Sequence, residues 1–261
     1  ANCVRIVWTM KDGTMEELDG VIEKCLAEKM IPMIELHDAT CKWDQELMNS
    51  ITAYWTDKKM VSIIKKYEKF LLLNFGNEIG TWTVAPEDWE NTYIKALKKM
   101  RKAGITVPVV IDMPKCGQDM NMLYASAENV QKGDPLNNII ISVHMWWTDG
   151  SDERIQDALS SAAGVNVPLI VGEFAHKGVG CAGEIRYKTI MEECEKAGIG
   201  WLAWSWGPGN SDCAEMDMTK DGRFDTLYGW GKETAVDHKY SIKNTSKKPV
   251  WLINNGDCES K

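Results

Sequence analysis

Short apolar runs alternate with longer amphipathic segments along almost the whole chain of 261 residues. Seven runs have the β-branched and aromatic composition of buried strands, at residues 4–8, 32–37, 70–78, 107–113, 139–146, 169–174 and 201–206. Segments with helical spacing lie between them, at residues 15–30, 86–103, 153–163 and 184–197. This alternation predicts parallel strands joined by crossover helices, in a sheet covered on both faces.

The sequence favours a closed barrel over an open doubly wound sheet. An open sheet usually carries a glycine-rich turn after its first strand, whereas the first run here continues into Thr9-Met10-Lys11. A barrel of this class has eight strands and about 250 residues. We therefore expect an α/β (β/α)8 TIM barrel whose first βα unit is absent from this chain. No linker-like composition interrupts the sequence, so residues 1–261 are expected to form one domain.

Polar side chains fall at the ends of the predicted strands rather than along them. They are Arg5, His37, Asn77, Glu78, His144, Glu173 and Ser205. Because the carboxyl ends of parallel barrel strands meet at one face, we expect these side chains to converge on one pocket.

Glu78 and Glu173 each end an apolar strand, where a carboxylate is costly unless it is paired, hydrogen-bonded or used in chemistry. Two carboxylates in one pocket suit cleavage of a glycosidic bond, because one can protonate the leaving oxygen while the other attacks the anomeric carbon. The alternative is that each forms a structural ion pair with Arg5 or a lysine. Two such glutamates in a tryptophan-rich chain favour the glycosidase interpretation.

Composition narrows the classes of partner. Twelve Trp against seven Tyr and four Phe indicate flat binding surfaces as well as core. A net charge of −8 without a basic block disfavours nucleic acid and anionic membranes as partners, and the apolar runs are too short to span a bilayer. The four His form neither an HxH nor an HExxH pattern, so we expect no metal, and the sequence implies no cofactor.

The strand-end residues resemble glycoside hydrolase family 5, in the clan of barrels with catalytic glutamates on strands four and seven. Asn77-Glu78 resembles the strand-four Asn-Glu of that clan, and Gly172-Glu173-Phe174 its strand-seven Gly-Glu-Phe. Four further segments are similar to its bacterial-type endo-β-1,4-mannanases, at residues 4–7, 35–40, 201–206 and 242–246. The resemblance implies a retaining endo-acting hydrolase of β-1,4-mannosidic bonds in mannan or glucomannan, with the two carboxyl groups about 5–5.5 Å apart.

By this resemblance Glu78 is the acid/base and Glu173 the nucleophile. Asn77 would hold the sugar 2-hydroxyl, and Arg5 would keep Glu173 ionised by its adjacent positive charge. Two histidines would bond sugar hydroxyls or the carboxylates, namely His37 and His144.

Trp204 matches the sugar platform of the family, since a flat indole stacks on the apolar face of a pyranose. Other tryptophans are expected either to line further subsites or to pack in the core, and they are Trp82, Trp146, Trp147 and Trp206. Trp146 stands where family members usually have a Tyr bonded to the nucleophile, which puts the tuning of Glu173 in question.

Two other functions stay open at this stage. Endo-β-1,4-glucanase activity uses the same machinery, and its substrate differs at the 2-hydroxyl. A non-catalytic carbohydrate-binding protein on a decayed barrel would explain the missing first strand and Trp146, but both glutamates stand in their expected places.

The eight cysteines contain no CxxC pair and favour an oxidising, extracellular setting. In a barrel, four would lie in the loops of the catalytic face and four at the opposite face, which leaves nine pairings. The preferred pairs are Cys41–Cys116, Cys181–Cys213, Cys3–Cys25 and Cys194–Cys258. A missing strand would expose a sheet edge, so a dimer with exchanged elements is a further expectation.

Overall fold

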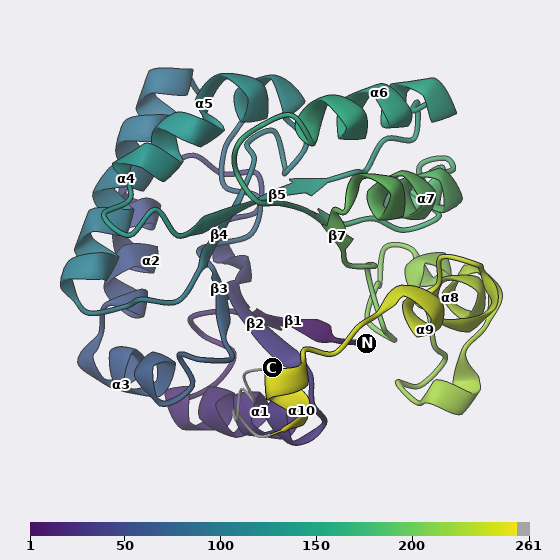
Figure 1. Ribbon diagram of the computed structural model, residues 1–261, viewed down its shortest axis with the longest axis horizontal. Helices are drawn as coiled ribbons and strands as arrows, with labels where there is room; N and C mark the ends of the chain where they lie inside the picture. Colours follow the sequence, from purple (N-terminus) through teal and green to yellow (C-terminus); the bar gives the residue numbers. More distant parts are fainter. Residues whose placement is uncertain (255–261) are drawn as a thin grey trace. The chain divides into compact units, whose positions relative to one another are not determined.

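The computed structural model describes residues 1–254 (Figure 1). The chain falls into two compact units. Unit 1 comprises Ala1–Ser142 and the segment that begins at Lys247, and unit 2 comprises Val143–Ser246. The division falls inside strand β5 (Ile139–His144), not in a linker.

Unit 1 is built on parallel strands that pair in the order of the sequence. They are β1 (Cys3–Trp8), β2 (Ile31–Leu36), β3 (Leu72–Asn74), β4 (Val109–Asp112) and the first part of β5. The register aligns Glu35 with Asn74 and Asn74 with Val110, so polar residues of neighbouring strands come side by side.

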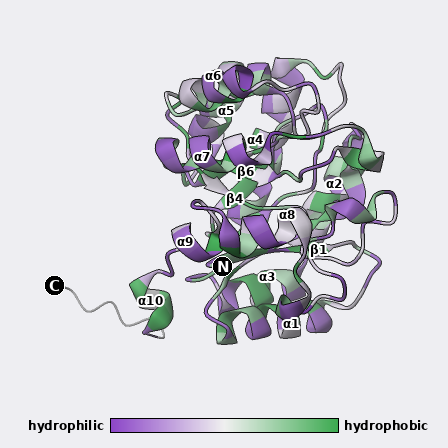
Figure 2. Ribbon diagram, turned by 90° about the vertical axis from the view of Figure 1, so that its right-hand side faces the viewer, coloured by the Kyte–Doolittle hydropathy of each residue, from purple (hydrophilic) through white to green (hydrophobic). Residues whose placement is uncertain are grey.

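The helices of unit 1 lie outside these strands (Figure 1). They are α1 (Met15–Ala27), α2 (Gln45–Trp55), α3 (Lys58–Lys66), α4 (Pro86–Lys102), α5 (Met120–Gly133) and the short α10 (Val250–Ile253), with a 3-10 turn at His37–Ala39. Helix α1 begins with a capping box in which the Thr14 hydroxyl accepts from the Glu17 N–H and the Glu17 carboxylate accepts from the Thr14 N–H. The helices α1 to α5 are amphipathic, as the mixed green and purple of α1 and α3 in Figure 2 shows, and their apolar faces are buried.

Unit 2 contains the end of β5 and the parallel pair β6 (Leu169–Glu173) and β7 (Gly200–Trp201). Its helices are α6 (Asp152–Ala162), α7 (Tyr187–Ala197), α8 (Gly229–Lys232), the π-helical turn Glu233–Asp237 and α9 (Ile242–Thr245). Three 3-10 turns complete it, at Val179–Cys181, Ala214–Met216 and Phe224–Thr226. Helix α7 ends where Gly198 adopts a left-handed conformation.

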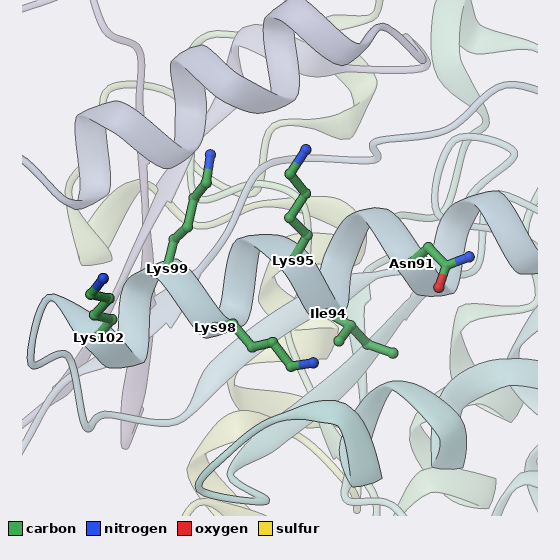
Figure 3. A pocket seen from close by; sticks show the side chains of 6 residues that line it. All are labelled: Asn91, Ile94, Lys95, Lys98, Lys99 and Lys102. Atoms are coloured by element: carbon green, nitrogen blue, oxygen red, sulfur yellow. The ribbon is translucent and has the colours of Figure 1, made fainter.

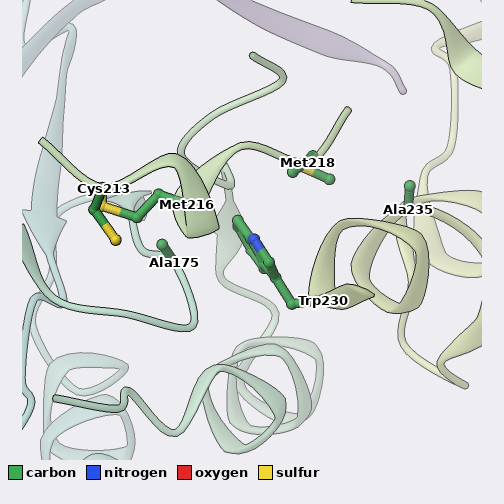
Figure 4. Close-up of a cluster of buried hydrophobic side chains, with 6 residues drawn as sticks. All are labelled: Ala175, Cys213, Met216, Met218, Trp230 and Ala235. Atoms are coloured by element: carbon green, nitrogen blue, oxygen red, sulfur yellow. The ribbon is translucent and has the colours of Figure 1, made fainter. Parts of the chain in front are cut away.

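A buried apolar cluster organises the segment that follows β7 (Figure 4). Its buried members are Ala175, Cys213, Met216, Met218, Trp230 and Ala235. Trp146 and Trp204 are partly buried against this cluster. The cluster therefore fixes part of each indole ring and leaves the rest accessible.

All seven predicted strands are found among the described residues, but two are much shorter than predicted. The run 70–78 forms a strand only at Leu72–Asn74, although Phe75 and Asn77 still donate backbone hydrogen bonds to Val110 and Leu36. Beyond this short strand the chain changes direction at Glu78, which adopts a left-handed conformation with φ of 49°. The run 201–206 likewise keeps only Gly200–Trp201 as strand before the chain turns.

The four predicted helices are present with shifted ends. The helix expected at 184–197 begins later, because Glu184 pairs with Lys177 in an antiparallel bridge. Helices α2, α3 and α5 were not predicted. No helix within residues 1–254 is long and apolar enough to cross a membrane.

Candidate active site

A buried polar network joins four neighbouring strands of unit 1. The Arg5 guanidinium, on β1, donates from Nε to Oδ1 of Asn74 on β3 at 3.0 Å. It also lies 3.8 Å from Glu35 Oε1 on β2 and 3.6 Å from Asp112 Oδ2 on β4. Both carboxylate side chains are fully buried, so the single guanidinium offsets the cost of burying two charges.

Asn77 belongs to the same network. Its Oδ1 accepts a 2.7 Å hydrogen bond from Arg5 Nη2, and its Nδ2 donates to the Thr40 hydroxyl at 2.9 Å. The same Nδ2 lies 3.5 Å from His37 Nε2, and His37 Nδ1 lies 2.9 Å from Glu35 Oε1. The structure thus brings together Arg5, His37 and Asn77, three residues that the sequence places in the site.

Glu78 follows directly, and its side chain is nearly buried, with 5% of the residue exposed. Its backbone N–H donates to Asp112 Oδ2 at 2.9 Å, and its carbonyl accepts from the Cys41 N–H at 3.0 Å. The Cys41 sulfur lies 3.8 Å from Glu78 Oε2. Both backbone polar groups of the predicted acid/base are therefore held by other strands or loops.

Two of the preferred disulfides are confirmed. Cys41 is bonded to Cys116 in unit 1, and Cys181 to Cys213 in unit 2. These are the four cysteines that the barrel assigns to the catalytic face. Because the sulfurs of Cys41 and Cys116 are bonded to each other, they are not available as metal ligands beside Glu78.

The Cys3–Cys25 pairing is wrong, because both cysteines carry free thiols. Burial raises the pKa of the Cys3 thiol to about 12, so it stays protonated. Sorting cysteines by barrel face restricts the possible partners but does not give the separation of two sulfurs. Cys194 also carries a free thiol, and its predicted partner Cys258 lies outside the described residues.

Glu173 ends β6 in unit 2 and is also nearly buried, with 4% exposed. Its Oε2 lies 3.4 Å from Nδ1 of the fully buried His144, and its carbonyl accepts from the Met145 N–H at 2.9 Å. The predicted nucleophile and the predicted strand-end histidine are therefore neighbours, held by the ends of β5 and β6.

Trp204 is fixed at both its backbone and its indole. Its backbone N–H donates to the Phe174 carbonyl at 2.8 Å, and its Nε1 donates to Asn210 Oδ1 at 2.8 Å. The Asn210 amide in turn donates to Asp217 Oδ1 at 2.7 Å and to the Ser205 hydroxyl at 3.0 Å. An aromatic plane held in this way loses little further freedom when a ligand stacks on it.

The other candidate tryptophans differ in exposure. Trp82 is 67% exposed, and Trp206 is 40% exposed with its Nε1 donating to the Gly222 carbonyl. Trp146 packs against the apolar cluster. Trp147 is buried with the Arg154 guanidinium over its ring, so core packing accounts for it.

Three network residues were not singled out as site residues from the sequence, namely Glu35, Asn74 and Asp112. Asp112 carries the signal that identified the two glutamates, a carboxylate that ends an apolar strand. Glu35 and Asn74 are polar residues within apolar strands, and the same cost of burial marks them.

A surface hollow of about 440 Å³ lies along α4 and contains none of these residues (Figure 3). It is lined by Asn91, Ile94, Lys95, Lys98, Lys99 and Lys102. The four lysines are exposed and belong to one helix, which is typical of a solvated helix face. The hollow is therefore no candidate for the active site.

Comparison with known proteins gives concordant matches. The family model described as cellulase (glycosyl hydrolase family 5) matches residues 1–210. A mannan endo-1,4-beta-mannosidase of Salipaludibacillus agaradhaerens is 31% identical, with 98% of this chain and 83% of that protein covered. One of Cellvibrio japonicus is 28% identical, with 100% of this chain and 61% of that protein covered. The solved β-mannanase of Thermomonospora fusca has a TM-score of 0.87 at 27% identity, covering 97% of this chain and 85% of that one.

Proposed function

The chain belongs to glycosyl hydrolase family 5, and from this premise we propose that it is a retaining endo-β-1,4-mannanase acting on mannan and glucomannan. One observation carries the proposal. Glu173 ends β6 and Asn77 and Glu78 follow β3, all three nearly buried, in a chain that is 31% identical to a mannan endo-1,4-beta-mannosidase over almost its whole length.

The proposed reaction has two displacements. In the first, the protonated Glu78 carboxyl gives its proton to the glycosidic oxygen while a Glu173 oxygen attacks the anomeric carbon, so the C–O bond breaks and a glycosyl ester forms. In the second, the Glu78 carboxylate takes a proton from water, whose oxygen attacks the same carbon and releases Glu173. Two inversions leave the anomeric configuration unchanged.

The surrounding groups have supporting roles in this proposal. Asn77, whose carbonyl oxygen accepts from Arg5 and whose Nδ2 donates one hydrogen to Thr40, would donate the second hydrogen of Nδ2 to the sugar 2-hydroxyl. His144 would hydrogen-bond Glu173, and His37 would contact a sugar hydroxyl. Trp204 would carry the pyranose at the cleavage subsite, and three tryptophans would serve further subsites, namely Trp82, Trp146 and Trp206.

The decisive experiment measures reducing-sugar release from galactomannan, glucomannan and carboxymethylcellulose, together with the anomer first formed from mannohexaose by ¹H NMR. We expect cleavage of the two mannans and a β-anomer product. Glu173→Ala should abolish turnover and keep mannohexaose binding. Glu233→Gln changes another hydrogen-bonded glutamate of unit 2 and serves as the matched control with activity retained. An α-anomer product would refute retention, and unchanged turnover in Glu173→Ala would refute the assigned nucleophile.

Endo-β-1,4-glucanase activity is the second candidate. It is favoured by one relative, the "Beta-mannanase/endoglucanase A" of Caldicellulosiruptor saccharolyticus, which is 28% identical over 90% of this chain and 18% of that protein. Cleavage of carboxymethylcellulose without cleavage of either mannan would select it. Sugar binding without any cleavage by the unmodified protein would instead select the non-catalytic carbohydrate-binding function.

An extracellular location is part of the proposal. It is supported by the disulfides Cys41–Cys116 and Cys181–Cys213, since such bonds persist mainly in oxidising compartments. Recovery of the activity in the culture medium of the source cells would test it.

A further inference from the structure

Glu78 has an unusual backbone conformation for a residue whose side chain must be accurately oriented. Its φ of 49° lies in the left-handed region, which a residue with a Cβ occupies only when its surroundings enforce it. In this conformation the Cα–Cβ bond of Glu78 leaves the backbone in a direction that a continued strand would not give. The groups that enforce the turn therefore decide where the carboxyl of Glu78 points.

Asp112 is one of those groups. Its Oδ2 accepts the Glu78 backbone N–H at 2.9 Å, and its Oδ1 accepts the Asn74 side-chain amide at 3.2 Å. The residue is fully buried and lies at the last position of β4, the strand paired with β3. A hydrogen bond from an N–H to a carboxylate is stronger than one to a neutral acceptor, and this one is anchored on a rigid strand.

We propose that Asp112 is a positioning residue for the general acid/base, holding the left-handed turn at Glu78 and so the direction of its carboxyl group. The inference rests on the proposed function, in which Glu78 protonates the leaving oxygen. Proton transfer to that oxygen requires hydrogen-bond geometry, and a small displacement of the donor slows the step.

The carboxylate is needed at this position because both of its oxygens accept from a donor. In an Asp112→Asn variant one amide orientation places the NH₂ group against the Glu78 N–H, and the other places it against the Asn74 Nδ2. The first orientation removes the bond to the Glu78 N–H directly, and the second removes the bond to Asn74 that helps to hold the side chain of residue 112 in place. The charge beside Arg5 Nη2, 3.6 Å away, is lost as well.

The test compares two substrates by kcat/KM, which reports the step that forms the glycosyl ester. Mannohexaose needs a proton on its leaving oxygen, whereas 2,4-dinitrophenyl β-mannobioside releases a phenolate that needs none. Asp112→Asn should lower kcat/KM about tenfold or more for mannohexaose and by less than about threefold for the aryl substrate. Glu78→Ala should give the same pattern with a larger difference.

Asp134→Asn is the matched control, because Asp134 is also buried, pairs with Arg101 and accepts a backbone N–H, from Asn138 at 2.9 Å. We expect it to leave the ratio of the two kcat/KM values unchanged. Equal losses on both substrates in Asp112→Asn would overturn the inference. If Asp112→Asn fails to fold, Asp112→Glu keeps the charge beside Arg5 and is judged by the same ratio.

The failure of the inference is distinct from that of the proposed function. An unmodified protein without activity on mannohexaose, or a Glu78→Ala variant that loses both substrates equally, would refute the proposed function itself. A selective loss in Glu78→Ala with no selective loss in Asp112→Asn would refute only the role of Asp112.

Discussion

Arg5 Nη2 donates a 2.7 Å hydrogen bond to Oδ1 of Asn77, the residue that precedes Glu78. The bond links the first strand of unit 1 to the chain that leaves β3, and it fixes which side of the Asn77 amide carries the oxygen. Since Nε of the same guanidinium bonds Asn74, one planar group orients two amides.

Arg5→Lys should lower kcat on galactomannan about 10²-fold, because one ammonium group cannot bond Asn74 and Asn77 in the two fixed directions of the guanidinium fork. Arg154→Lys, in an exposed pair with Asp149, is the control and should leave kcat unchanged. Steady-state kinetics with purified variants measures kcat. Equal kcat values for Arg5→Lys and the unmodified protein would contradict the role given to the Arg5 guanidinium.

Trp204→Ala should raise KM for mannohexaose about tenfold, equivalent to roughly 1.4 kcal/mol, because the stacking plane is removed. Trp204→Phe keeps a flat ring but loses the hydrogen bond to Asn210, so its KM should lie between that of the unmodified protein and that of Trp204→Ala. Isothermal titration of mannohexaose to both variants in the Glu173→Ala background measures binding alone. Equal affinity in all proteins would exclude Trp204 as the platform.

The two disulfides should differ in what their removal changes. Chain-entropy arithmetic for separations of 75 and 32 residues gives losses of about 4.5 and 3.7 kcal/mol in the free energy of unfolding for Cys41–Cys116 and Cys181–Cys213, respectively. Serine at both Cys41 and Cys116 should also lower kcat, because the Cys41 N–H holds the Glu78 carbonyl. Urea unfolding and kinetics on the two double variants separate these effects. A larger loss of kcat in the Cys181/Cys213 variant would contradict this assignment.

Stability should fall as the pH is lowered below about 6.5. Burial lowers the pKa of His176, whose ring stacks on Trp230, and burial also lowers that of His238. A group with a lower pKa in the folded state binds fewer protons there than in the unfolded chain, so falling pH favours unfolding from its unfolded pKa down to its folded one. His176→Gln should reduce the slope of unfolding free energy against pH between pH 7 and 5. An unchanged slope would show that this imidazole does not contribute.

Much of the fold follows from patterns in the sequence that have a direct physical cause. The run ending at Glu173 is a strand because it is apolar and β-branched up to a carboxylate, and the structure ends β6 at that residue. The shortness of β3 could not be predicted in this way. The turn after it lies at Glu78, a left-handed residue that is not a glycine and that is held by Asp112 and Cys41, residues distant in sequence.

In the site as well, some contacts follow from the sequence pattern and others depend on residues that are distant in the sequence. His37 and Asn77 were expected at strand ends and contact each other, because parallel strands bring those ends together. Arg5 was also expected at a strand end, but it is the third residue of β1 and reaches Asn77 through its long side chain. Asp112 was overlooked although it ends an apolar strand just as the two glutamates do. Its importance lies in a bond to a backbone N–H, which a sequence pattern of side chains does not display.

The buried free thiol of Cys194 can report the opening of one of the two units. With a pKa of about 12, roughly one Cys3 thiol in ten thousand is ionised at pH 8, and burial also raises the pKa of the fully buried Cys194 thiol. An alkylating reagent should therefore modify the buried Cys194 thiol only after local or global opening, whereas the partly exposed Cys3 and Cys25 should react in the folded protein at rates limited by their ionisation. Because Cys194 belongs to unit 2, peptide mapping of the labelled protein would time the opening of that unit.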